Sequence, residues 1–259
     1  MRLTFLGTGT STGVPVIGCR CDVCRSDDPR DRRLRTSAVV EADGLTVVFD
    51  TGPDFRAQAL RAGLTRLDAV LFTHGHFDHV AGLDDVRPFL YDSSVPIPCH
   101  ADAATAAHLR RAVPYAWGGS AYPGVPVLAL HDVDGPFALE SRYGAPGRLD
   151  VTPVPVLHGQ LPILGYRIGR LAYLTDVSAI PDASRALLDG LDVLVLDALR
   201  AAPHPTHFSL DEAVDEARRI GARQTYFVHM THTVAHAEVD AALPPGISLA
   251  FDGLAVDVA

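Results

Sequence analysis

The sequence predicts an α/β fold, because apolar runs of strand length alternate with helical patterns along the chain. The two halves repeat this alternation with similar element patterns, which indicates two related sheet-and-helix units. With 259 residues, 47% of them hydrophobic, the chain can bury a substantial core. We therefore predict one large domain over residues 1–259.

In the first half, β-branched and aromatic residues gather in short runs between turn residues. These runs predict strands at 2–6, 36–41, 45–50, 67–73 and 95–99. Helical patterns follow Asp54 and Asp78 and extend from Ala101 to Ala112. The segment 113–147 is rich in Gly, Pro and Tyr, and we interpret it as a long loop or hairpin near the mouth of the active site.

The second half repeats the theme. Strands are predicted at 149–157, 163–168, 171–175, 192–197 and 223–228, and helices at 181–189, 209–220 and 236–243. Ser209 and Glu212, three residues apart, form a capping-box pattern that marks the beginning of one of these helices.

The segment Thr73-His74-Gly75-His76-Phe77-Asp78-His79 follows the apolar run 67–72 and holds three imidazoles and one carboxylate. Four ligands this close would crowd a single ion, but two ions sharing the segment can use all of them. Neutral imidazole suits zinc, iron, nickel or manganese, and the carboxylate adds the charge that a second cation needs. A solvated His-rich turn is the alternative. Candidate ligands that follow later strand-like runs argue against it: His158, Asp176 and His229.

This spacing resembles the metallo-β-lactamase superfamily, whose signature is H-x-H-x-D-H after a strand. The resemblance spans nearly the whole chain and implies a four-layer αβ/βα sandwich. It also implies two divalent transition metals, zinc or manganese, in the active site. The ligands that it implies fall into two groups: His74, His76 and His158 for one metal, and Asp78, His79 and His229 for the other, with Asp176 bridging.

Cys19, Cys21 and Cys24 form a C-x-C-x-x-C cluster. An odd number of clustered cysteines, in a chain without a secretory signal, argues against disulfide bonds. Three thiolates with this spacing can bind one face of a tetrahedral zinc. The chain is most similar to the superfamily branch that contains phosphoribosyl 1,2-cyclic phosphate phosphodiesterase. In that branch a His three residues after the last active-site His closes a structural zinc site, which here implies His232. A redox role is the alternative for this cluster, and Cys99 is interpreted as an ordinary core residue.

Composition excludes several classes of function. The 22 basic residues are all arginines, so a lysine Schiff base and a P-loop lysine are excluded. A formal charge of −9 argues against a broad nucleic-acid surface. No apolar run has the length of a membrane span, and the N-terminus lacks a signal-peptide pattern, so we expect a cytoplasmic protein without a membrane partner.

Further residues are candidates for support or substrate contact. Asp50 ends the strand at 45–50 and is expected to orient a ligating imidazole. Arg35 or Ser37, at the beginning of the strand at 36–41, is expected to contact substrate phosphate; the alternative is a solvated charged loop.

His207 lies between the strand at 192–197 and the following helix, and the metals do not require it as a ligand. Related phosphodiesterases carry a non-ligand His in a corresponding loop, where it protonates the leaving oxygen. The resemblance therefore implies that His207 is the general acid, and we predict His207 and Asp78 as catalytic residues. His204 lies nearby and is the alternative. His100, His108, His131 and His236 have no partner motif and are interpreted as surface or satisfied core residues.

The resemblance implies a binuclear metal-dependent phosphodiesterase that hydrolyses a small, cyclic, phosphoribosyl-type substrate through a metal-bridging hydroxide. One alternative is a tRNA 3′-end endonuclease of the same superfamily, although no long basic Gly/Pro-rich arm is visible. Others are a hydrolase of β-lactams, thioesters or phosphorylcholine, a di-iron redox protein, and a metal-storage or sensory protein. The di-iron branch needs a carboxylate where this chain has His76. The sequence leaves the oligomeric state open, with a homodimer as one option.

Overall fold

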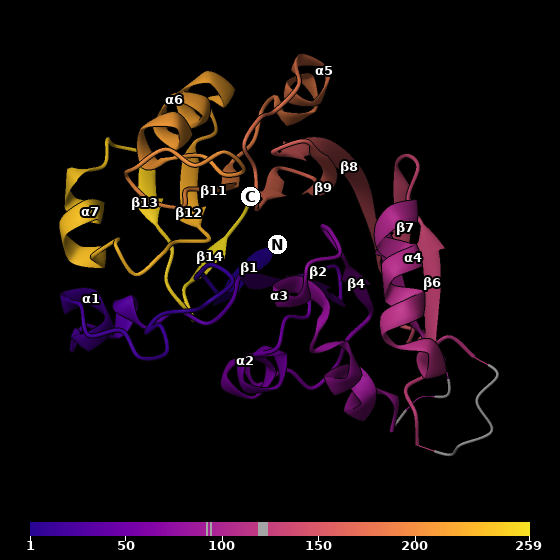
Figure 1. Cartoon of the computed structure of the whole chain (residues 1–259). Coiled ribbons are helices and arrows are strands. Elements are labelled where there is room, and N and C mark those ends of the chain that lie inside the picture. Colours follow the sequence, from indigo (N-terminus) through magenta and orange to yellow (C-terminus); the bar gives the residue numbers. More distant parts are fainter. Residues whose placement is uncertain (92, 94, 119–123) are drawn as a thin grey trace.

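The computed structural model describes residues 1–259 except 92, 94 and 119–123. Within these residues, two mixed sheets of seven strands each pack face to face, with helices on their outer sides (Figure 1). This arrangement confirms the predicted αβ/βα sandwich.

The first sheet has the order β14-β1-β2-β3-β4-β5-β6. Its strands are β1 (Arg2–Gly7), β2 (Ser37–Ala42), β3 (Leu45–Phe49), β4 (Ala69–Leu71), β5 (Ile97–Ala101), β6 (Leu128–Asp132) and β14 (Ala255–Asp257). The helical segments of this half are α1 (Asp22–Arg25), η1 (Pro29–Asp31), α2 (Phe55–Ala62), α3 (Phe77–Val80), η2 (Leu83–Leu90), α4 (Ala103–Ala112) and η3 (Pro114–Ala116).

The second sheet has the order β13-β12-β11-β10-β9-β8-β7. Its strands are β7 (Phe137–Glu140), β8 (Arg148–His158), β9 (Leu161–Ile168), β10 (Leu171–Leu174), β11 (Val193–Asp197), β12 (Gln224–Val228) and β13 (Ile247–Leu249). Its helical segments are α5 (Asp182–Arg185), η4 (Ala186–Leu188), α6 (Leu210–Ile220) and α7 (His236–Ala242). None of the helices that the structure describes combines the length and the apolar character that a membrane crossing requires.

The alternation of side chains along each strand explains why each sheet packs against the other sheet on one face and against helices on the other. In β3, Val47 and Phe49 enter the core between the sheets, whereas Val48 faces the outer core on the same side as Phe55 of α2. In β11, Val195 enters the central core, and its neighbours pack in the outer core with α6. Successive strand side chains point to opposite faces, so strands that are apolar throughout need cover on both sides.

The directions of the strands bring their carboxyl ends together. The parallel pairs β3–β4 and β10–β11–β12 place the carboxyl ends of these strands on one side of each sheet, where the strands end. β8 and β10 are both antiparallel to β9, so β8 also ends on that side. The loops that follow these strands therefore converge, and they carry the predicted ligands.

The prediction of a long loop or hairpin at 113–147 is wrong for the residues that the structure describes, which leave out 119–123. This segment contributes a strand to each sheet, because β6 pairs with β5 and β7 pairs with β8. It therefore does not form a hairpin. Parallel pairing of β6 with β5 places the beginning of β6 on the side of the sheet opposite the predicted ligands, and the end of β6 on the side of the ligands.

Candidate functional site

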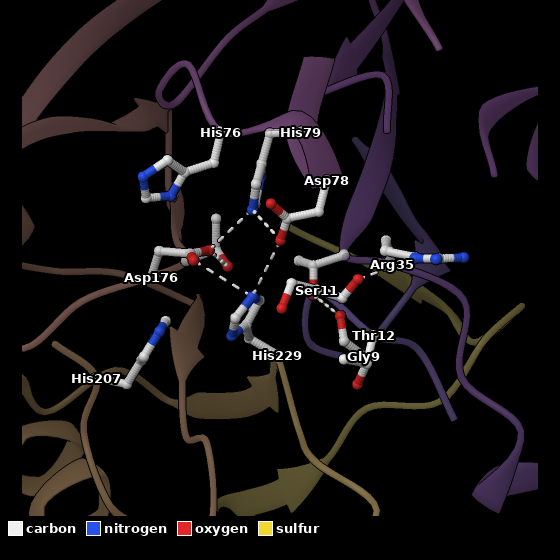
Figure 2. A network of polar contacts seen from close by, with 12 residues as sticks. Gly9, Ser11, Thr12, Arg35, His76, Asp78, His79, Asp176, His207 and His229 are labelled. Carbon is white, nitrogen blue, oxygen red and sulfur yellow. Dashed lines mark hydrogen bonds and ion pairs between the residues drawn. The ribbon is translucent and has the colours of Figure 1, made fainter. Parts of the chain in front are cut away.

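The predicted metal ligands lie together, and Figure 2 shows five of them: His76, Asp78, His79, Asp176 and His229. They come from the β4–α3 loop, α3, the end of β8 and the residues that follow β10 and β12. The structure arranges them in the two predicted groups: His74, His76 and His158, and Asp78, His79, Asp176 and His229.

In the first group, the side chains of three histidines converge. His74 Nε2 lies 2.9 Å from His76 Nδ1, and the rings of His76 and His158 have centroids 5.2 Å apart. Nδ1 of His158 lies 2.7 Å from the carbonyl oxygen of Thr206, which can only accept a hydrogen bond. Nδ1 therefore carries the proton, and Nε2 of His158 keeps a lone pair for a cation.

In the second group, Asp176 lies between two imidazoles. Its Oδ2 lies 3.2 Å from His79 Nε2, and its Oδ1 lies 3.3 Å from His229 Nε2. Asp78 Oδ2 lies 3.3 Å from His79 Nε2. Asp176 Oδ1 is also 4.0 Å from His74 Nε2, so this carboxylate reaches toward both groups.

The donor atoms of the second group fit a metal ion. Nε2 of His79 and Nε2 of His229 are buried and have no hydrogen-bond partner among the described residues. Ligand atoms about 2.0–2.2 Å from one tetrahedral ion are roughly 3.3–3.5 Å apart, close to the separations of these nitrogens from the carboxylate oxygens. An ion between them would satisfy nitrogens that are otherwise buried without a partner.

The electrostatics of the site also favour cations. Burial alone would lower the pKa of His79, but Asp176 and Asp50 raise it well above its ordinary value. Burial opposes ionisation of Asp176 as well, yet His229 and His79 hold its pKa well below the usual range. The pKa of His74 is lowered, first by burial and then by His79, so this imidazole is neutral. Ionised carboxylates beside a neutral imidazole form a donor set suited to divalent transition metals.

The backbone holds several of these residues in a rare conformation. Asp50, Asp176 and His229 have φ values of 58°, 60° and 63°, in the left-handed region that non-glycine residues seldom adopt. Asp50 and His229 directly follow β3 and β12, and Asp176 is the second residue after β10. Such strain persists where surrounding contacts enforce it, and it clusters at functional sites.

Asp50 makes the contact expected of it. Its Oδ2 lies 2.8 Å from His79 Nδ1, and it also accepts hydrogen bonds from the backbone N–H and the hydroxyl of Thr73. Because Nδ1 of His79 donates to Asp50, Nε2 is the atom left to face Asp176.

His207 lies beside both ligand groups (Figure 2). Its ring centroid is 4.6 Å from that of His158 and 4.8 Å from that of His229. Burial, followed by the charge of His229, lowers the pKa of His207 to about 4. The alternative residue, His204, is less buried and lies 5.1 Å from the His207 ring.

Asp197 is a site residue that the sequence analysis missed. Its two carboxylate oxygens each lie 3.4 Å from an Nδ1 atom, one of His207 and the other of His229. The available signal was a carboxylate at the end of the buried run Val193–Asp197, next to a loop that carries a candidate acid.

The structure corrects the expectation for Ser37 and changes that for Arg35. Ser37 is fully buried, and its hydroxyl donates to the carbonyl oxygens of Phe49 and Asp50, so it does not face the site. Arg35 Nη1 pairs with Asp54, and its Nε donates to the carbonyl oxygen of Ser11. In Figure 2 the guanidinium points away from the His/Asp cluster.

The cysteine cluster forms a second candidate metal site. The Sγ atoms of Cys19, Cys21 and Cys24 lie 3.3, 3.4 and 3.6 Å from Nδ1 of His232. A tetrahedral zinc with Zn–S of about 2.3 Å and Zn–N of about 2.0 Å separates sulfur and nitrogen by roughly 3.5 Å. The side chains therefore have the spacing of a closed Cys3His zinc site.

The remaining histidines lie outside both groups. His131 is exposed, whereas His100 is buried and stacks on Phe137. Nε2 of His108 and Nδ1 of His236 are buried without a hydrogen-bond partner among the described residues, so these two rings are not fully satisfied. Cys99 is fully buried, as expected of a core residue.

A family model described as a beta-lactamase superfamily domain matches residues 46–230. The matched segment covers more than half of the chain and contains all seven residues of the two ligand groups. The chain belongs to the metallo-β-lactamase superfamily. This confirms the resemblance that the H-x-H-x-D-H motif indicates.

The chain is similar to three proteins that differ in their identity to it and in the share of their own length that it covers. A solved structure described as a new diphosphatase from the PhnP family is 47% identical, with a TM-score of 0.89 over 99% of this chain and 97% of that chain. Zn²⁺-bound PqqB from Methylobacterium extorquens shares the fold at 23% identity, with a TM-score of 0.77 over 99% and 100% of the two chains. Octanoyltransferase from Porphyromonas gingivalis is 41% identical over 259 residues, which cover 98% of this chain and 51% of that protein. This chain thus spans about half the length of that relative.

Proposed function

We propose that this protein is a metal-dependent hydrolase that cleaves a small phosphodiester. The observation that carries the proposal is the convergence of seven imidazole and carboxylate side chains in two groups, with Asp176 reaching toward both. The 47% identity to a protein described as a PhnP-family diphosphatase supports a substrate that contains phosphoryl groups.

Each ligand group would hold one divalent transition metal, and Asp176 would contact both. When bound, two such cations supply a nucleophile from water near neutral pH and neutralise the charge on the phosphoryl group. The surrounding residues would orient the ligands, because Asp50 aims His79 and the Thr206 carbonyl aims His158. Asp78 would act through the same centre, as one of its carboxylate ligands.

We propose His207 as the acid that protonates the leaving oxygen. Its ring lies against residues from both ligand groups, and Asp197 holds its Nδ1 side. Burial keeps the free imidazole neutral at pH 7, but an anionic phosphoryl group beside the ring would raise its pKa. Substrate binding would therefore help His207 to gain the proton that it donates.

A second candidate function is diphosphatase activity, which the printed description of the 47% identical structure favours. The same residues could act on a phosphoanhydride. The reactions differ in the leaving group, because an alkoxide leaves poorly without a proton, whereas phosphate is a better leaving group. Dependence on His207 therefore separates the two candidates.

A substrate panel tests the proposal directly. The metal-loaded protein is assayed with ribosyl cyclic phosphate, 2′,3′-cyclic nucleotides, bis-p-nitrophenyl phosphate, a nucleoside diphosphate sugar and precursor tRNA. The highest kcat/KM on ribosyl cyclic phosphate supports a phosphodiesterase with a cyclic substrate. The highest value on the diphosphate supports the second candidate, and a preference for precursor tRNA supports the endonuclease alternative. Absence of hydrolysis of every phosphoryl substrate would contradict the proposal.

The two ligand groups and the Cys3His cluster imply a metal content of three ions per chain, two at the active site and one structural zinc. Protein purified without chelator is expected to approach this number in elemental analysis. The variant Asp176→Asn should lose active-site metal while keeping the zinc of the cysteine cluster. If the unaltered protein contains about one metal ion per chain and takes up no added zinc or manganese, the arrangement of two metals at the active site is contradicted.

His207→Ala is expected to lower turnover of an alkyl phosphodiester by about 100- to 10,000-fold, the usual contribution of general acid catalysis. Metal content should not change, because His207 is not one of the proposed ligands. The loss should be much smaller for bis-p-nitrophenyl phosphate, since p-nitrophenolate departs without a proton. His204→Ala is the matched control and should retain turnover. Equal losses on both substrates, or loss of metal, would show that His207 is not the acid.

A further inference from the structure

A tight turn near the N-terminus presents unused polar groups beside the candidate site. The N–H of Gly13 donates to the carbonyl oxygen of Thr10 at 2.8 Å, which closes the turn around Ser11 and Thr12. Thr10 and Gly13 are buried, whereas Ser11 and Thr12 are exposed at the tip. The turn is a separate element from the two ligand groups.

The turn is held rigidly next to the ligands. The N–H of Thr10 donates to the carbonyl oxygen of Met230, the residue after His229, and the N–H of Met230 donates to Thr8. On the other side of the turn, Val14 and Arg33 exchange two backbone hydrogen bonds of 2.8 Å. Figure 2 shows Ser11 and Thr12 on the side of the site formed by Asp78 and His229.

Arg35 secures the same turn. Its Nε donates to the carbonyl oxygen of Ser11 at 3.2 Å, and its Nη1 pairs with Asp54 at 3.0 Å. The Arg35 side chain also packs close to Gly13, where an added Cβ would lie 3.8 Å from its Cδ. Gly52 lies between Arg35 and Asp78. A Cβ added to Gly52 would lie 3.7 Å from the Cβ of Arg35 and would collide with the carbonyl oxygen of Asp78. Arg35 therefore holds the turn against Asp54, with its Nε and Nη1 bonded within the protein.

Several hydrogen-bond donors at the tip of the turn have no partner within the protein, among the residues that the structure describes. Among the described residues, the hydroxyl of Ser11 and the backbone N–H groups of Ser11 and Thr12 have no hydrogen-bond partner. The Thr12 hydroxyl makes one 3.3 Å contact, to the carbonyl oxygen of Gly13. These exposed groups can donate to the hydroxyl or phosphate oxygens of a sugar phosphate, whereas an aryl or alkyl group offers them no acceptor.

We infer that the Ser11–Thr12 turn binds the oxygen-rich, sugar-bearing part of the substrate, and that Arg35 is a positioning residue that holds this turn. The inference rests on the proposed phosphodiesterase function and deepens it, because it assigns residues of this chain to the sugar-bearing part of the substrate. Arg35 then supports the Ser11–Thr12 turn and does not itself contact the substrate.

Substrate-selective losses test the inference. Ser11→Ala and Thr12→Val are each expected to lower kcat/KM for ribosyl cyclic phosphate by about 2- to 10-fold, the value of one neutral hydrogen bond. Arg35→Ala and Arg35→Lys should lower it at least as much, because alanine has no donor and lysine lacks the two separate nitrogens that bond Ser11 and Asp54 in Arg35. All four variants should hydrolyse bis-p-nitrophenyl phosphate, which has no sugar, at the unaltered rate. Thr65→Val, at an exposed position in another loop, is the control and should leave both values unchanged.

The outcomes separate this inference from the proposed function. If the unaltered protein hydrolyses both substrates and the variants lose rate equally on the two, or on neither, the turn does not bind the sugar and the inference is overturned. If the unaltered protein hydrolyses neither substrate, the proposed function fails first. A selective loss on the sugar substrate, carried by KM more than by kcat, supports the inference.

Discussion

His229→Ala is expected to lower phosphodiester hydrolysis by at least about 1,000-fold. Cations at such sites stabilise transition-state charge by several kcal/mol, and each 1.36 kcal/mol changes the rate tenfold. His229 supplies a buried Nε2 that lies 3.3 Å from Asp176 Oδ1 and has no hydrogen-bond partner among the described residues. Without it, the second metal would depend on Asp78, His79 and the shared Asp176. The measurement is kcat/KM at saturating metal.

The fold should survive this change. Alanine and histidine both carry a Cβ, so the left-handed backbone at position 229 has a similar cost in the two proteins. The melting temperature should fall by only a few degrees, and the zinc of the cysteine cluster should remain. His131→Ala, at an exposed histidine outside both ligand groups, is the control and should keep full activity. Retention of activity by His229→Ala would contradict its assignment as a ligand.

His232→Ala, only three residues further along the chain, is expected to act on stability instead. His232 Nδ1 contacts the sulfur atoms of all three clustered cysteines, so its removal opens the closed site. Structural zinc contributes directly to folding free energy, by about 10–16 kcal/mol in zinc-finger peptides. A loss of about 3 kcal/mol, a fraction of that value, would lower Tm by about 6–12 °C in a chain of roughly this size.

The comparison of the two variants is the sharper test. Tm, metal content and turnover are measured for both, with and without chelator. His232→Ala should lose zinc to chelator readily, and its activity should fall less than that of His229→Ala, through disorder of the segment that joins the turn at Ser11 to the cysteines. Matching profiles for the two variants would show that the division of ligands between the two sites is mistaken.

Short-range patterns allowed much of this protein to be predicted. The H-x-H-x-D-H spacing, the C-x-C-x-x-C spacing and the alternation in strands such as β3 each depend on residues a few positions apart. The predicted capping box of α6 is confirmed, because the hydroxyl of Ser209 accepts from the N–H of Glu212 while the Glu212 carboxylate accepts from the N–H of Ser209. Such local interactions are set by backbone geometry and need no knowledge of distant segments.

The errors and omissions all concern long-range neighbours. Whether 113–147 forms a hairpin or one strand in each sheet depends on partners in β5 and β8. Ser37 lies only two residues after Arg35, yet it is buried, because β2 lies between β1 and β3 and the Ser37 hydroxyl donates to the carbonyl oxygens of Phe49 and Asp50 at the end of β3. Asp197 becomes a site residue only because β11 lies beside β12, which places its carboxylate against both His207 and His229.

The sequence by itself thus determined the α/β class, the ligand types and their order along the chain, because these follow from local period and side-chain chemistry. Only the tertiary structure decided which polar side chains join the two ligand groups, which of them support a neighbour, and which groups at Ser11 and Thr12 have no partner among the described residues. The physical reason is that a hydrogen bond or ion pair is a property of two groups and of the distance between them. For residues far apart in the chain, that distance exists only once the two sheets have packed.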